Sequence, residues 1–244
     1  MTGGRSAILT YHSLDDSRSA ISTAPSLFRQ QMELLAASGI PVVPLNQAAH
    51  HPGSIAITFD DGYGNLLDHA IPVLELHRLP ATIFMVSEYC GRRNNWPSQP
   101  RGRVPDLPLL SWDELSALPP LISLGAHTMT HPDLCRLSAE ACERELRECQ
   151  DMIQQRTGRP ARWLAYPYGT SSSQVRSLAG RHFDLAVGTS LQFLSPRSNH
   201  LDLPRIDAYY LRGWFTPDRL FTRSCSLYMG LRGLLRDVRR FVSQ

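Results

Sequence analysis

Short apolar runs rich in β-branched residues alternate along this chain with segments of helical periodicity, and some of these runs end directly in polar residues. The clearest is 54–59, which Asp60 and Asp61 follow at once. Strands that alternate with helices build a parallel sheet, and α/β folds place their chemistry where such strands end. The pattern therefore predicts an α/β protein with this carboxylate pair at the active edge of its sheet.

Local signals place further elements. Ser138 begins a long helix that reaches Thr157, and a capping box at Ser111-x-x-Glu114 begins a shorter one. We also expect a helix over 66–76 despite Pro72, a strand that begins at Val42-Val43 and a strand over 81–86.

Two adjacent carboxylates suit a division of labour in hydrolysis. One can hold a cation, and its neighbour can accept a proton from the attacking water. Taken alone, Asp60-Asp61-Gly62 also fits a turn that ends a strand.

His127 and His131 favour the functional interpretation, because they follow a second apolar run at 121–124 and are four residues apart. Two imidazoles and one carboxylate leave coordination positions open, which is typical of a catalytic metal site.

In these motifs the sequence resembles the polysaccharide deacetylase family (NodB homology, carbohydrate esterase 4), and in particular its circularly permuted exopolysaccharide-type branch. The resemblance rests on the motifs at 58–62, 127–131 and 166–169 and spans roughly residues 5–210. It implies a distorted (β/α)7 barrel. It also implies that Asp60 is the general base, and that Asp61, His127 and His131 bind a divalent ion, zinc first and cobalt, nickel or manganese as alternatives.

By the same resemblance Pro167 and Tyr168 line the substrate groove, and the backbone N–H of Tyr168 holds the oxyanion. One departure concerns Ala165, which stands where the family usually has the arginine that contacts the base. Arg205, in the apolar segment 203–207, is our candidate for the missing guanidinium, since its planar fork can hold a carboxylate with two hydrogen bonds. An ordinary salt bridge to another acid is the alternative.

The general acid is a second departure, because no histidine follows His200, whereas the family commonly takes this group from a histidine near its C-terminal end. In the permuted branch the histidine lies on the first strand, and here the run 7–11 leads into His12. We therefore predict His12 as the acid, with His200 as the alternative. Trp96 lies in a long loop over 88–110 and either stacks on a sugar face or anchors that loop.

Composition fits one globular domain over 1–244 with a helical extension at 223–244. The net charge of +3 is too small to indicate nucleic-acid binding. Five cysteines without C-x-x-C spacing, and a start without a signal-peptide pattern, favour a cytoplasmic protein.

The segment 227–242 carries an apolar stripe (Leu231, Leu234, Leu235, Val238 and Val242) among arginines. It predicts either a helix docked on the barrel or a weak contact with the inner membrane surface.

Together these features predict a metal-dependent deacetylase acting on N-acetyl groups of an amino sugar in a polysaccharide, oligosaccharide or lipid-linked glycan. An O-acetyl esterase and a catalytically silent carbohydrate-binding relative are the alternatives.

Overall fold

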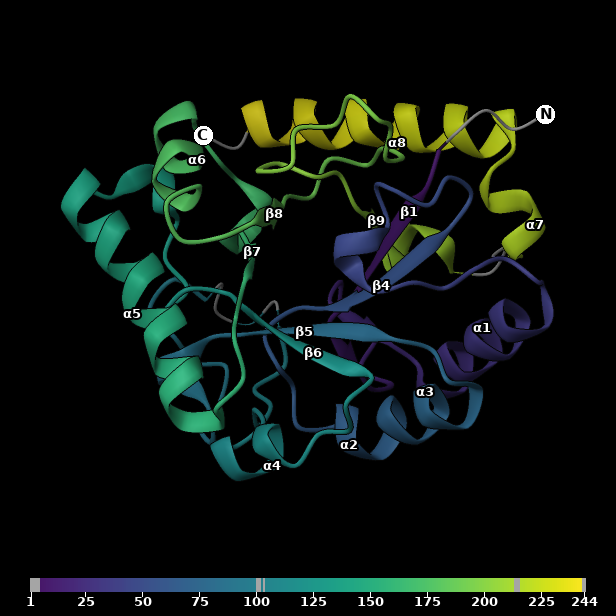
Figure 1. Cartoon of the computed structure of the whole chain (residues 1–244). Helices are drawn as coiled ribbons and strands as arrows, with labels where there is room; N and C mark the ends of the chain where they lie inside the picture. Colours follow the sequence, from purple (N-terminus) through teal and green to yellow (C-terminus); the bar gives the residue numbers. More distant parts are fainter. Residues whose placement is uncertain (1–4, 100–101, 103, 213–215, 243–244) are drawn as a thin grey trace.

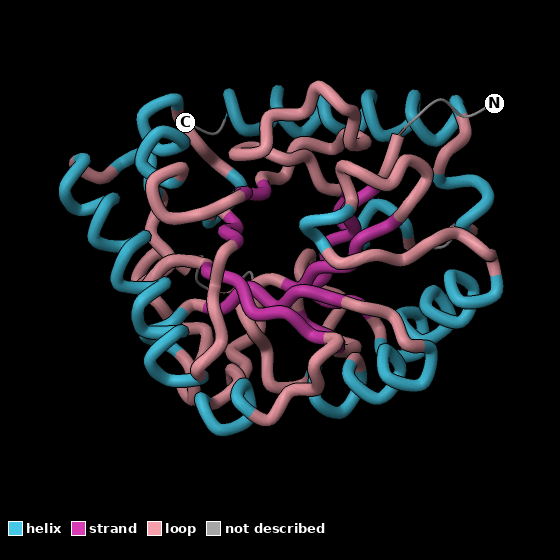
Figure 2. The backbone as a smooth tube through the Cα atoms, viewed as in Figure 1, coloured by secondary structure: helices cyan, strands magenta, loops and turns pink. Residues whose placement is uncertain are grey.

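The computed structural model of the chain describes residues 5–99, 102, 104–212 and 216–242, with only the backbone over 237–242. Seven strands form one parallel sheet in the order β8-β7-β6-β5-β4-β1-β9. The sheet curls into an incomplete barrel that helices surround (Figures 1 and 2). Its strands are β1 (Ala7–Tyr11), β4 (Ile55–Phe59), β5 (Ala81–Met85), β6 (Ile122–Ala126), β7 (Trp163–Ala165), β8 (Leu185–Val187) and β9 (Ile206–Asp207). The predicted distorted (β/α)7 barrel is confirmed.

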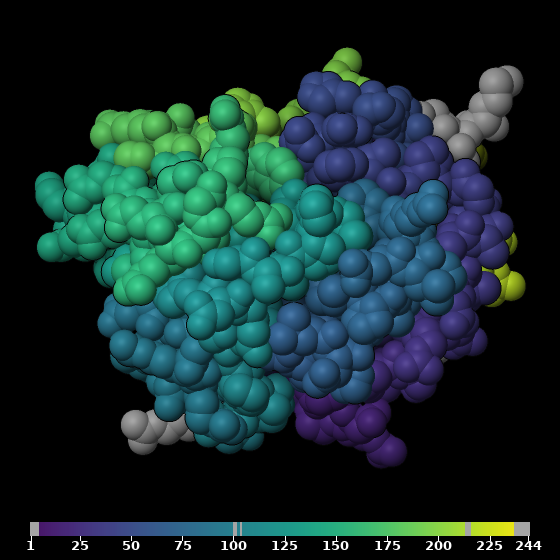
Figure 3. Space-filling model, turned by 60° about the horizontal axis from the view of Figure 1, so that its bottom comes forward, coloured from purple at the N-terminus to yellow at the C-terminus, as the bar shows by residue number. Residues whose placement is uncertain are grey.

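The longest helices of the outer layer are α1 (Pro25–Ala37), α5 (Ala139–Thr157) and α8 (Arg223–Val242). The shorter ones are α2 (Leu66–His69), α3 (Ile71–His77), α4 (Trp112–Ser116), α6 (Ser173–Ala179) and α7 (Pro217–Leu220). Single 3-10 turns cover Leu45–Gln47, Ser87–Tyr89, Leu134–Arg136, Pro167–Gly169 and Ala208–Leu211, and β2 (Ser13–Leu14) pairs with β3 (Ser22–Thr23) as a small separate ladder. The segments from β4 to α6, blue through green, make up most of the face in Figure 3.

Most local predictions are confirmed. Ser138 caps α5 with its side chain, and Ser111 and Glu114 form the expected capping box of α4. The helix expected over 66–76 is wrong as a single element, because the chain breaks at Ala70 into α2 and α3, two residues before Pro72. Val42 makes only an isolated bridge to Ile55 and begins no strand.

The C-terminal helix docks on the barrel, but through a different face from the predicted stripe. Cys225 and Met229 are buried, whereas Leu231, Leu234 and Leu235 are 58%, 62% and 46% exposed. Val238 and Val242 lie outside the residues whose side chains are described. Periodicity identified an amphipathic helix correctly but could not tell which side the barrel accepts. Within the described residues, no helix combines the length and apolar character that crossing a membrane requires.

Candidate active site

Asp60 and Asp61 lie where β4 ends, and the backbone turns sharply between them and the following loop. Asp61 has φ +69° and Gly62 has φ +73°, and for a residue with a Cβ this left-handed conformation is uncommon. The turn sends the two carboxylates to different partners. Asp60 meets Arg205 and His12, and Asp61 meets the two histidines.

The histidines belong to a strained loop after β6, which we call the ligand loop (127–131). Thr128 and His131 have φ +68° and +58°, and the amide of His131 donates to Thr128 Oγ1 at 3.0 Å. Glu145 of α5 holds the loop from outside: its carboxylate accepts hydrogen bonds from the amides of Met129 (2.8 Å) and Thr130 (3.0 Å) and from Thr130 Oγ1 (2.7 Å). Such strain persists where surrounding contacts over-determine it, as they do here.

Asp61, His127 and His131 converge as a candidate metal centre. All three are buried, and their ligand atoms lie within 4.8 Å of one another. Asp61 Oδ1 is 3.4 Å from His127 Nε2 and 3.6 Å from His131 Nε2, and it has no hydrogen-bond partner among the described residues. Tetrahedral ligands about 2 Å from a shared zinc ion lie about 3.3 Å apart. The three side chains therefore fit a divalent cation that would satisfy the orphaned oxygen.

The charges around this triad also suit a cation. Burial raises the pKa of Asp61, but contacts with His127 and His131 outweigh burial and hold that pKa well below its usual range. Burial, together with the charge of His127, lowers the pKa of His131 to about 3, so its imidazole stays neutral. His127 Nδ1–H donates to the carbonyl of Ala165 at 2.7 Å, which leaves Nε2 turned toward Asp61.

Arg205 meets Asp60 in a buried, two-pronged ion pair. Nη1 and Nη2 donate to the two carboxylate oxygens at 2.7 and 2.6 Å, and Nε donates to the carbonyl of Gly188 at 2.8 Å. The side chains are 1% and 4% exposed. Burial raises the pKa of Asp60, but Arg205 and His127 more than offset it, so the pKa lies below its usual value. The guanidinium that pairs with Asp60 therefore comes from the segment before β9. Ala165, which stands where the family usually has this arginine, contributes only its backbone carbonyl, which accepts from His127.

His12 lies beside Asp60 in the wall of a cavity. Its Nε2 is 3.9 Å from Asp60 Oδ2, and its side chain is 21% exposed. Both residues line a cavity of about 290 Å³ together with Asp61, His127 and His131. His200, the alternative acid, is exposed and is not among the residues that line this cavity.

Pro167 and Tyr168 form a 3-10 turn after β7, and Tyr168 has φ +60°. The Tyr168 ring lies edge-on to the His131 ring with centroids 4.8 Å apart, and its hydroxyl donates to the carbonyl of Ser98 at 2.9 Å. The cavity wall includes Tyr168 and Gly169. A Cβ at Gly169 would come within 2.1 Å of Thr189, so the turn packs tightly against the loop that follows β8.

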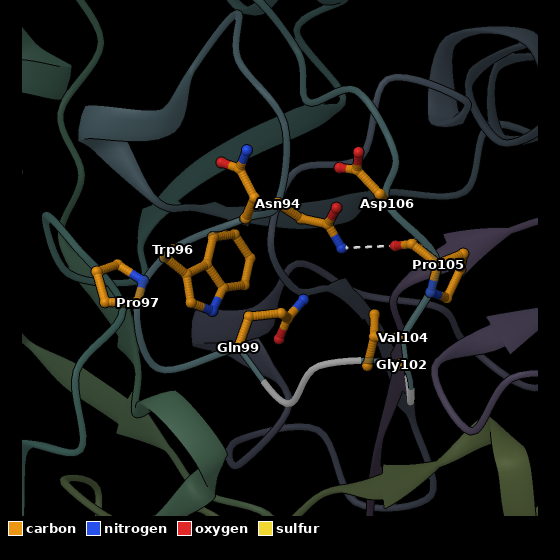
Figure 4. A pocket seen from close by; sticks show the side chains of 9 residues that line it. Asn94, Trp96, Pro97, Gln99, Gly102, Val104, Pro105 and Asp106 are labelled. Carbon is orange, nitrogen blue, oxygen red and sulfur yellow. Dashed lines mark hydrogen bonds between the residues drawn. The ribbon is translucent and has the colours of Figure 1, made fainter.

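Trp96 is 2% exposed and stacks on His131, with ring centroids 4.5 Å apart. Most of its surface is thus engaged within the protein, which favours its interpretation as an anchor of the loop. The same loop encloses a second cavity of about 390 Å³, whose lining includes Asn94, Asn95 and Asp106 (Figure 4). Trp96, Gln99 and Val104 line both cavities, so the two adjoin.

Several residues at the site were missed by sequence reasoning. Asp207 pairs in register with Thr10, lines the same cavity as His12 and Asp60, and interacts with the charge of His12; burial raises its pKa. Its place at the end of β9 was an available signal. Glu145 and Arg236 carried none, because an acid on a charged helix and an arginine in an arginine-rich segment look like solvated residues.

Comparison with known proteins identifies the family of the chain. The family model described as polysaccharide deacetylase matches residues 47–182, which is more than half of the chain. A chitooligosaccharide deacetylase from Rhizobium leguminosarum bv. trifolii is 36% identical over 119 residues, covering 47% of this chain and 46% of that protein. The chain spans about half the length of the curated relatives that it matches.

Two solved structures share the fold. The Streptococcus pyogenes deacetylase PplD in complex with acetate superposes with a TM-score of 0.73 and 20% identity, covering 88% of this chain and 96% of that one. IcaB from Ammonifex degensii superposes with a TM-score of 0.72 and 22% identity, covering 93% of this chain and 97% of that one. Together with the family match, the arrangement of both carboxylates and both histidines leads to one conclusion: the chain belongs to the polysaccharide deacetylase family.

Proposed function

We propose that this protein is a metal-dependent deacetylase that hydrolyses N-acetyl groups of an amino sugar within a glycan. One observation carries the proposal. The adjacent carboxylates are divided between two environments, Asp60 against a guanidinium and an imidazole, and Asp61 against two buried imidazoles. This is the separation of base and ligand that metal-assisted amide hydrolysis requires.

Asp61, His127 and His131 would hold the cation, with zinc as the first candidate because two nitrogen donors and one carboxylate suit it. When bound, a divalent ion would supply Lewis-acid activation of water and of the acetamide carbonyl. The carbonyl of Ala165 orients the imidazole of His127, and the rings of Trp96 and Tyr168 pack against the imidazole of His131.

Asp60 is the proposed base. Arg205 keeps it ionised and fixes both of its oxygens, so the carboxylate can accept a proton from water as the water oxygen adds to the amide carbon. The carbonyl oxygen gains negative charge in this step. The backbone N–H of Tyr168, on the left-handed turn at the cavity wall, is the proposed donor to it.

His12 is the proposed acid. When the tetrahedral intermediate collapses, the carbon–nitrogen bond breaks, and the amine must receive a proton to leave. An imidazolium at His12, whose Nε2 lies 3.9 Å from Asp60 Oδ2, would donate it. The products are acetate and a free amino sugar.

The adjoining cavity around Asn94, Asn95 and Gln99 favours an oligosaccharide or polymer over a single sugar. Amide side chains are suitable partners for sugar hydroxyls. The family membership and the chitooligosaccharide-deacetylase relative support the same substrate class.

The test is acetate release by zinc-loaded protein from N-acetylglucosamine oligomers and from O-acetylated sugars of matched length, for wild type, Asp60→Asn and His12→Ala. We expect release from the N-acetylated oligomers and a loss of at least 100-fold in both variants. Release from the O-acetylated sugars alone would make the protein an esterase. Wild type that releases no more than Asp60→Asn from any substrate would support a silent carbohydrate-binding protein.

A further inference from the structure

The inner face of α8 contributes to the wall of the catalytic cavity. On this face, Cys225 and Met229 are buried in the first half of the helix, and Gly233 lies against the loop that follows β8. Arg236, about one turn later, reaches inward, and its Nη1 donates to the carbonyl of Thr189 at 2.5 Å. Figure 1 shows α8 running alongside the open part of the barrel between β8 and β9.

Arg236 lines the same cavity as His12, Asp60 and Asp61. Among the described residues it is the only arginine in that lining, and the chain contains no lysine. Tyr210 shares this wall. Burial raises the pKa of Tyr210, and the charge of Arg236, which lines the same cavity, acts in the opposite direction.

The proposed reaction does not use Arg236. Asp60 is already balanced by Arg205, and the charge of Asp61 would be more than offset by a divalent cation. Asp207, the third acid in the lining, interacts with the charges of His12 and Arg205. Arg236 therefore brings to this cavity a guanidinium that serves as neither base, ligand nor acid in the proposed reaction. Guanidinium groups are well suited to binding carboxylate and phosphate groups through two parallel hydrogen bonds.

We propose that Arg236, with Tyr210 in the same cavity wall, determines specificity by binding an anionic substituent, a carboxylate or a phosphate, on the glycan next to the N-acetyl group. This inference rests on the proposed function and refines its substrate class. Tyr210 adds a hydroxyl donor and an apolar ring to the same wall. The preferred substrate is then an acidic glycan or a phosphorylated one.

The experiment compares three oligosaccharides of equal length with the zinc-loaded full chain. One consists of N-acetylglucosamine alone, one alternates N-acetylglucosamine with glucuronic acid, and one carries phosphate on oxygen 6. Acetate release gives kcat and KM for wild type, Arg236→Gln and Arg236→Lys. Arg232→Gln is the matched control, because Arg232 lies one turn away on the same helix and is exposed.

We expect wild type to have a KM at least tenfold lower for one of the anionic substrates than for the neutral one. Arg236→Gln should raise that KM about 10- to 100-fold, at least tenfold more than its effect on the neutral substrate. Arg236→Lys should keep part of the preference, and Arg232→Gln all of it. The carboxylate and phosphate substrates show which anion is bound.

Equal losses of Arg236→Gln on all three substrates would overturn the proposal, because they would make Arg236 only a clamp for Thr189. A wild type without anionic preference would overturn it as well. If Arg236→Gln does not fold, the test uses wild type alone. Added salt must then raise the KM for the anionic substrate much more than the KM for the neutral substrate. Calorimetry of the binding of the three substrates separates this inference from the proposed function. If binding prefers an anionic substrate in an Arg236-dependent way but no acetate is released, only the proposed function is contradicted.

Discussion

Replacing Arg205 by methionine should destabilise the protein strongly, because it leaves the carboxylate of Asp60 buried without its counter-charge. The pair is joined at 2.6 and 2.7 Å, and its side chains are 1% and 4% exposed. Removing one partner of such a pair costs about 3–5 kcal/mol. For a chain of this size, each kcal/mol lowers the unfolding midpoint by about 2–4 °C, which gives a decrease of about 6–20 °C.

The assay is thermal unfolding of chelator-treated protein, so that metal binding does not contribute to the midpoint. The double variant Asp60→Asn/Arg205→Met should recover much of the loss, since it removes the buried charge as well. Arg162→Met is the matched control: Arg162 also pairs with an aspartate through two hydrogen bonds, at 2.5 and 3.0 Å, but that pair is exposed. A midpoint for Arg205→Met that is no lower than that of Arg162→Met would refute the reasoning.

Three further predictions concern other parts of the molecule. Gly125→Ala should cost about 1–3 kcal/mol of stability in urea unfolding, because a Cβ there would lie 2.4 Å from the ring of Phe84; an unchanged midpoint would contradict this. Glu145→Ala should weaken zinc binding about 10- to 100-fold in calorimetry, since it removes the acceptor that holds the ligand loop, and equal affinity would make Glu145 dispensable. Alkylation of native protein at pH 8 should modify Cys135 first and leave Cys149 unmodified, because Cys135 is exposed whereas burial raises the pKa of Cys149 to about 12; peptide mass spectrometry decides.

The sequence was sufficient for those parts of the site that depend on strand ends. Asp60 and Asp61 follow β4 and the ligand loop follows β6, so their convergence required only a parallel sheet. The pairing of Arg205 with Asp60 spans 145 residues and joins β4 to the segment before β9. It was predicted only because the resemblance exposed a missing arginine at Ala165.

Other features depend on packing that periodicity does not encode. The leucine stripe of α8 is real, yet the barrel accepts the face with Cys225, Met229 and Gly233, where small and flexible side chains allow close approach. For the same reason, the pattern did not distinguish Arg236 from the other arginines around this stripe. The sequence left open whether Trp96 stacks on a sugar or anchors its loop, and its stacking on His131 depends on the path of a long loop that no local signal determines.

Acetate release during a metal titration tests the central claim most directly. Chelator-treated protein receives increasing zinc in the presence of N-acetylglucosamine oligomers, and the initial rate is recorded for wild type and His127→Ala. Our account predicts that the wild-type rate rises from background and reaches its plateau at one zinc per chain, whereas His127→Ala stays near background. Full activity before any zinc is added, or an equal response in His127→Ala, would contradict it.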